Sequence, residues 1–109
     1  MEKWIDAGPV TDFPDGEHKC IKVDGHPLVV CHVEGAFYVL QNICPHAGLP
    51  LGEGERRGLV LTCPFHGYTY NIRNGKNIDF PDQEVPVRTY ETKVEDGRVR
   101  VKIETEANS

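Results

Sequence analysis

Two short segments decide how this chain is interpreted, Cys44-Pro45-His46 and Cys63-Pro64-Phe65-His66. Each segment offers one thiolate and one imidazole, and sixteen residues separate the first segment from the second. Two Cys and two His could hold a single zinc ion or a two-iron, two-sulfide cluster. Structural zinc sites usually place two Cys on one knuckle and two His three to five residues apart on a helix. Because each segment here is mixed, the pattern favours a cluster with the Cys on its inner iron and the His on its outer iron.

The spacing C-x-H-x16-C-x2-H, with a glycine soon after each motif, resembles the Rieske family. The resemblance covers essentially the whole chain, and its specificity lies in residues 44–70. It implies a [2Fe-2S] cluster bound by Cys44, His46, Cys63 and His66. Two ferric ions, two sulfides and two thiolates sum to zero charge, so an added electron is less costly than on a four-thiolate dianion. Such clusters have potentials of about −150 to +300 mV, against about −400 mV for plant-type ferredoxins.

The length and charge of the chain narrow the class of protein. Its 109 residues suit one domain, and the 39% hydrophobic and 27% charged shares are ordinary for a soluble globule. No apolar run approaches a membrane span and no secretory signal opens the chain, so we expect a cytoplasmic protein with no membrane partner. The net charge is −5, of which residues 1–43 contribute −4 through three Lys and seven acidic side chains. Nucleic acid is therefore an unsuitable partner, whereas a basic protein surface fits. Mild acidity for solubility would explain the same charge.

Turn signals divide the chain into short apolar or β-branched runs. Asp-Gly and Asn-Gly pairs favour tight hairpins because these residues tolerate positive φ. No apolar spacing of three to four residues persists for the length of a helix. We therefore expect an all-β domain, a small antiparallel barrel or sandwich. The expected strands are 17–23, 27–33, 36–42, 58–62, 68–72, 87–95 and 98–104.

The resemblance refines this fold into two parts of a single domain, residues 1–109. A cluster-binding β subdomain, residues 43–80, would be inserted into a basal barrel or sandwich made of residues 1–42 and 81–109. The resemblance also places Phe80-Pro81 and Val85-Pro86 in a loop that covers a third side of the cluster, although turn formation alone would explain these prolines.

The other cysteines and histidines lie in or beside expected basal strands. Cys20 and Cys31 fall on one face of a hairpin, and a turn centred on Gly25-His26 would place them opposite each other. A disulfide between them stays open, although a reducing cytoplasm favours buried thiols. No second ligand stands at metal spacing from the remaining histidines, for which we expect surface or packing roles: His18, His26 and His32.

Four positions around the motifs indicate which type of Rieske protein the chain resembles. Respiratory Rieske proteins join their two ligand loops by a disulfide, but the matching positions here are Leu49 and Phe65. The chain thus looks like the ferredoxins that serve bacterial oxygenases, with apolar packing around its cluster. In high-potential Rieske proteins, a tyrosine four residues after the second ligand His bonds a ligand thiolate, and Tyr70 matches it. A serine two residues after that His bonds a sulfide, and Tyr68 stands in its place. One bond kept and one lost place the potential at the low end of the Rieske range.

The resemblance to these ferredoxins implies a soluble one-electron carrier, expected to be a monomer, that passes electrons from a flavin reductase to a terminal oxygenase. No catalytic base, nucleophile or substrate pocket stands out, so the chain is expected to be a non-catalytic component of a dioxygenase-type system. Two alternatives remain open. One is the Rieske-like small subunit of an assimilatory nitrite reductase, and the other is a zinc-binding or redox-sensing structural module.

Overall fold

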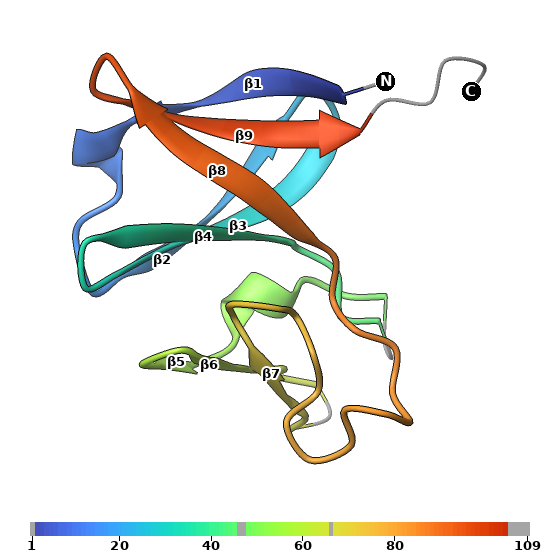
Figure 1. Cartoon of the computed structure of the whole chain (residues 1–109). Helices are drawn as coiled ribbons and strands as arrows, with labels where there is room; N and C mark the ends of the chain where they lie inside the picture. Colours follow the sequence, from blue (N-terminus) through green and yellow to red (C-terminus); the bar gives the residue numbers. More distant parts are fainter. Residues whose placement is uncertain (1, 46–47, 66, 105–109) are drawn as a thin grey trace.

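A computed structural model describes residues 2–45, 48–65 and 67–104 as an almost entirely antiparallel β structure (Figure 1). One sheet has six strands in the order β1-β9-β8-β4-β3-β2, and a second has three in the order β5-β6-β7. The all-β class expected from the sequence is confirmed. The elements are β1 (Glu2–Pro9), η1 (Val10–Asp12), β2 (His18–Val23), β3 (His26–Val33), β4 (Ala36–Gln41), η2 (Leu51–Glu53), β5 (Arg56–Arg57), β6 (Val60–Thr62), β7 (Thr69–Asn71), β8 (Thr89–Glu95) and β9 (Arg98–Glu104).

The strand β3 forms a central wall that is buried on both faces. Leu28 and Val30 face the inside of the curled six-stranded sheet, where they join an apolar cluster with β1, β4 and β9. Val29 and Cys31 face the other way and pack against residues of the three-stranded sheet. A strand buried on both faces needs a continuous apolar run rather than alternation, and residues 28–31 supply it. In Figure 1 the three-stranded sheet lies beneath this wall.

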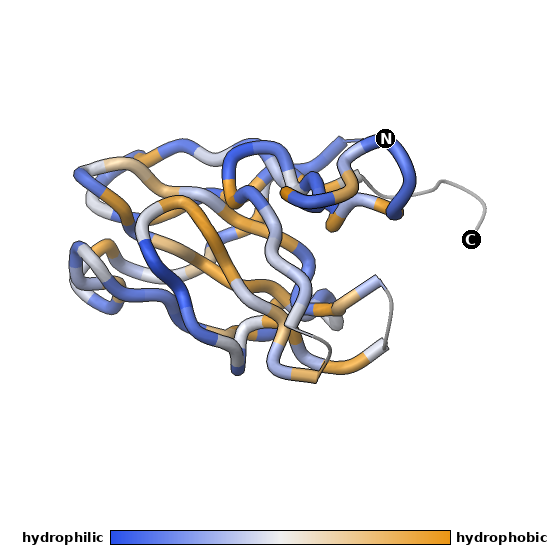
Figure 2. Tube along the Cα trace, turned by 90° about the horizontal axis from the view of Figure 1, so that it is seen from below, coloured by the Kyte–Doolittle hydropathy of each residue, from blue (hydrophilic) through white to orange (hydrophobic). Residues whose placement is uncertain are grey.

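Hydropathy follows this arrangement along the trace. In Figure 2 hydrophobic and hydrophilic stretches alternate along the trace, and many of the outer bends are hydrophilic. The part of the chain that the structure describes contains no helix long and apolar enough to cross a membrane.

The hairpin between β2 and β3 corrects one expectation from the sequence. Its turn is Asp24-Gly25, with φ of 50° and 82°, as a type I′ turn requires. The register pairs Cys20 with Val29 and therefore places Cys31 opposite His18. The two cysteines share a face, as expected, but they do not lie opposite each other and are not joined by a disulfide. Cys31 is buried, whereas Cys20 is exposed, contrary to the expectation of two buried thiols.

The short helix η2 connects the two sheets. Gly52 donates its backbone N–H to Asn42 Oδ1 at 2.7 Å, and its carbonyl accepts from His18 Nε2 at 2.9 Å. A Cβ at this position would clash with Cys20 Sγ and lie 2.8 Å from Val29 Cγ2. Only glycine therefore lets the segment that follows the first motif press against β2 and β3.

We predict that Gly52→Ala destabilises the protein by about 1–3 kcal/mol, the usual cost of forcing an extra methyl into a packed interior. Denaturant unfolding of the holo protein measures this change. Cys20→Ala should recover part of the loss in the double variant, because it removes one of the two clashing groups. An unchanged unfolding midpoint for Gly52→Ala would show that η2 does not need its close approach.

Candidate metal centre

The two candidate ligand loops are closed by the same pair of backbone hydrogen bonds. The N–H of Cys44 donates to the carbonyl of Leu49 at 2.8 Å, and the N–H of Gly48 donates back to Cys44 at 2.8 Å. In the second loop Cys63 donates to Tyr68 at 2.7 Å and Gly67 donates to Cys63 at 3.0 Å. In each loop the cysteine N–H donates to the carbonyl five residues later, and the cysteine carbonyl accepts from the N–H four residues later.

A glycine occupies the same place in both loops, four residues after the cysteine. Gly48 has a φ of 69° and Gly67 a φ of 72°, values that L side chains rarely adopt. The glycines noted in the sequence therefore turn each loop back on its cysteine. The two loops present their thiols in equivalent ways, as two halves of one binding site would.

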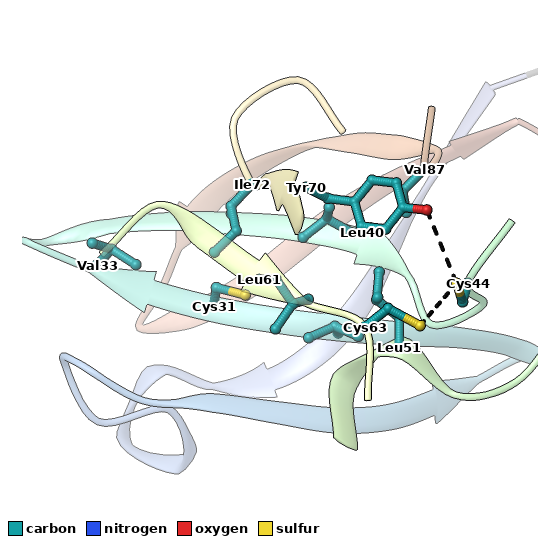
Figure 3. Close-up of a cluster of buried hydrophobic side chains, with 11 residues drawn as sticks. Cys31, Val33, Leu40, Cys44, Leu51, Leu61, Cys63, Tyr70, Ile72 and Val87 are labelled. Atoms are coloured by element: carbon teal, nitrogen blue, oxygen red, sulfur yellow. Dashed lines mark hydrogen bonds between the residues drawn. The ribbon is translucent and has the colours of Figure 1, made fainter. Parts of the chain in front are cut away.

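The loops bring the two thiols together at one end of the apolar cluster between the sheets (Figure 3). Cys44 and Cys63 are 0% and 1% exposed, and their Sγ atoms lie 3.0 Å apart. This distance exceeds the ~2.04 Å of a disulfide bond. Two thiolates at ~2.3 Å from one tetrahedral metal lie roughly 3.8 Å apart. A small outward movement of the two sulfurs would therefore make room for an iron.

These donors fit a [2Fe-2S] cluster. Among the described residues, no group of three or more His, Cys, Asp or Glu side chains gathers around a metal position. His46 and His66, the ligands expected from the sequence, both lie outside the described residues.

Tyr70 lies beside the thiols, as the sequence predicts. Its ring is 1% exposed, and its Oη lies 4.0 Å from Cys44 Sγ, within hydrogen-bond range for sulfur (Figure 3). Burial and then the neighbouring thiol of Cys44 raise the pKa of Tyr70 well above its usual value. The hydroxyl therefore stays protonated at neutral pH and can act as a donor.

Two of the three remaining histidines, His18 and His32, make structural contacts through their rings. His18 bonds Gly52, as described above, and His32 Nδ1 bonds the carbonyl of Phe13 at 2.7 Å. The His32 ring also stacks on Phe37 with centroids 4.0 Å apart. His26 begins β3 next to the hairpin turn.

Five apolar side chains in the ligand loops and in the loop between β7 and β8 are exposed. Leu49 and Phe65 belong to the ligand loops and are 43% and 44% exposed. The other three come from the loop between β7 and β8. We call this set the apolar rim: Leu49, Phe65, Ile78, Phe80 and Val85.

Sequence reasoning missed Asn77, which lies in the same loop. It is the one buried polar side chain among the described residues, with 1% exposure. A single asparagine in a polar loop carries no periodic signal. Its spacing to Asp79-Phe80 is the only local indication, because Asn side chains commonly bond backbone two residues on.

Comparison with known proteins now assigns the family. The model of the Rieske [2Fe-2S] domain matches residues 3–91. The ferredoxin component of the naphthalene 1,2-dioxygenase/salicylate 5-hydroxylase systems of Ralstonia sp is 32% identical over 103 residues, which cover 94% of this chain and 98% of the relative. The chain belongs to the Rieske [2Fe-2S] domain family, and the [2Fe-2S] cofactor expected from the sequence is thereby confirmed.

Solved structures share the fold, as two examples show. The ferredoxin in a complex of reduced oxygenase and oxidised ferredoxin of carbazole 1,9a-dioxygenase superimposes with a TM-score of 0.80 at 32% identity, covering 90% of this chain and 91% of the other. A putative NADH-dependent nitrite reductase small subunit from Mycobacterium tuberculosis has a TM-score of 0.81 at 20% identity, covering 97% and 99%. At that identity the second likeness shows the fold alone.

We predict that the two non-motif thiols differ sharply in reactivity. Burial raises the pKa of Cys31 to about 12, so its reactive thiolate is scarce at neutral pH. Desolvation also raises the pKa of Cys20, but this thiol is exposed. Alkylation of the folded holo protein at about pH 8, followed by peptide mass spectrometry, should label Cys20, increasingly as the pH rises, and leave Cys31 unlabelled until unfolding. Early labelling of Cys31 would contradict its burial.

Proposed function

We propose that this protein is a one-electron carrier that takes electrons from a flavin-dependent reductase and passes them to a terminal oxygenase. The [2Fe-2S] cluster would be held by Cys44 and Cys63 on one iron and by His46 and His66 on the other. When bound, the cluster supplies a single reversible redox step. The protein would act as a monomer in the cytoplasm, and the flavin reductase would be its electron donor.

The observation that carries the proposal is the pair of buried thiols 3.0 Å apart, presented by two loops of equivalent geometry. Such a pair, with one imidazole from each loop, gives the oxidised centre no net charge. Adding one electron then costs less than in a four-thiolate centre. The relatives support the wider role, because their names describe ferredoxin components of oxygenase systems.

We assign residues 43–80 to a cluster-binding part and residues 1–42 and 81–109 to a basal part. The three-stranded sheet belongs wholly to the first part, and the six-stranded sheet belongs wholly to the second. The basal part supplies the wall β3–β4 against which the thiols are buried.

The apolar rim is the proposed docking surface for the redox partners. It combines residues of both ligand loops with Ile78, Phe80 and Val85 from the loop between β7 and β8, and it would border the point where an electron leaves the cluster. Contiguous exposed apolar side chains commonly mark protein interfaces. The acidic basal part would steer a basic partner at long range, while the rim supplies the contact.

The alternatives receive less support. The nitrite-reductase likeness rests on fold alone, whereas the oxygenase ferredoxins exceed 30% identity over nine-tenths of the chain. A single zinc would not require a pair of equivalent mixed loops. Iron, zinc and acid-labile sulfide analysis separates these cases directly.

We predict that His46→Ala or His66→Ala abolishes the normal reduced-state EPR signal, because each removes a proposed iron ligand. His18→Ala and His32→Ala serve as controls. Each removes one hydrogen bond, worth about 1 kcal/mol, and His32→Ala also removes the stack on Phe37, so both should lower stability and leave the signal intact. A normal signal after His66→Ala would contradict the ligand assignment.

The docking surface is tested by two matched substitutions. Val85 is 68% exposed in the apolar rim, and Val94 is 52% exposed on β8 in the basal sheet. Val85→Asp should slow electron transfer to the oxygenase encoded at the same locus roughly tenfold, since losing one well-packed contact costs about 1.4 kcal/mol. Val94→Asp adds the same charge and should change the stopped-flow rate little. Equal slowing by both variants would place the docking surface elsewhere.

A further inference from the structure

The backbone of Asn77 pairs directly with the backbone of Tyr70. The two residues form an isolated antiparallel bridge between β7 and the loop that follows it. Two hydrogen bonds of 2.9 Å flank the bridge, each joining a neighbour of Tyr70 to a neighbour of Asn77. Such a non-hydrogen-bonded pair brings its side chains closer together than the alternative pair does. The chain thus fixes Asn77 on the same face as Tyr70.

The oxygen of the Asn77 side chain is already occupied. Oδ1 accepts the backbone N–H groups of Asp79 at 3.0 Å and Phe80 at 2.9 Å, which shapes the start of the loop. Nδ2 is buried and meets no hydrogen-bond partner of standard geometry among the described residues. A buried N–H without a partner is costly, so its surroundings should contain an acceptor that it can reach.

The Tyr70 hydroxyl is the acceptor that the bridge favours, because it brings the two side chains to the same face and both are buried, at 1% exposure each. A hydroxyl offers one proton and two lone pairs. If the Asn77 amide takes a lone pair, the single Tyr70 proton is left for Cys44 Sγ, 4.0 Å away.

We propose that Asn77 is a positioning residue of the metal centre, whose amide holds the Tyr70 hydroxyl in the orientation that donates to the Cys44 sulfur. The inference rests on the proposed role of Cys44 as a cluster ligand. A donor to this sulfur is worth more when the centre gains negative charge, so the Asn77–Tyr70–Cys44 chain favours the reduced state. Asn77 acts through Tyr70 and does not itself touch the sulfur.

Asn77→Asp is the most informative substitution. A carboxylate keeps both turn-forming bonds to Asp79 and Phe80, but it presents an acceptor where Nδ2 stood. The Tyr70 proton would then turn toward the carboxylate and away from the sulfur. The matched control is Asn74→Asp, which makes the same charge change in the same loop at an exposed asparagine. Asn74 Oδ1 likewise accepts a backbone N–H, that of Lys76 at 2.9 Å.

Protein-film voltammetry of the holo variants measures the reduction potential. We expect Asn77→Asp to weaken the reduction equilibrium about tenfold relative to Asn74→Asp, which is about 59 mV for one electron. In a Tyr70→Phe background most of that difference should disappear, because the remaining effect is that of the charge alone. Asn77→Ser keeps a side-chain oxygen for the turn and removes the amide, so it should give a smaller shift of the same sign.

Two results would overturn the inference. One is an equal potential for the Asn77 and Asn74 variants, and the other is an undiminished difference in the Tyr70→Phe background. If Asn77→Asp does not load with cluster, Asn77→Ser measured with and without Tyr70→Phe decides between the same outcomes. A wild-type protein without a reduced-state EPR signal would instead overturn the proposed function, which keeps the two failures distinct.

Discussion

The close approach of two buried thiols is the constraint on which the rest of this structure depends. Cys44 and Cys63 come from different loops, yet their sulfurs lie 3.0 Å apart with almost no exposure. As thiolates, two groups held this way would repel each other and lose solvation, so their ionised form is stabilised by a cation that compensates both charges. Metal binding and folding should therefore be strongly coupled in this part of the chain.

The remainder of the fold can be understood as the support for that pair. The strands β3 and β4 bury the thiols from one side. Through the close approach of Gly52, η2 holds the ligand loop of Cys44 against these strands. Tyr70 closes the site from β7. By contrast, the apolar rim leaves large side chains exposed beside the loops. A carrier needs both features, because a buried centre tunes its potential while an uncovered border lets partners approach it closely.

Much of this architecture could be predicted from the sequence, because its signals are local. Mixed Cys/His motifs and Asp-Gly turns indicated the donor set and most strands. The strand β1 was missed because Ile5 is its one buried residue and the pairing with β9 shifts between Asp6 and Gly8, which blurs alternation. The Cys20–Cys31 pairing was wrong because the turn uses Asp24-Gly25, which offsets the register.

Asn77 illustrates a different limit of sequence reasoning. Its importance arises from a bridge to Tyr70 and from complete burial, which depend on how the loop folds back on β7. Neither property is encoded in a motif or a period. The two histidine ligands remain a prediction from spacing, since both lie outside the described residues.

Mössbauer spectroscopy of the iron-57 protein tests the central claim most directly. An all-sulfur iron carries more negative charge than an iron with two neutral imidazoles, so the two sites should differ. The account predicts two inequivalent ferric sites in equal amounts, of which only the imidazole-bound iron becomes ferrous on one-electron reduction. Two equivalent irons, or a single zinc in their place, would contradict it.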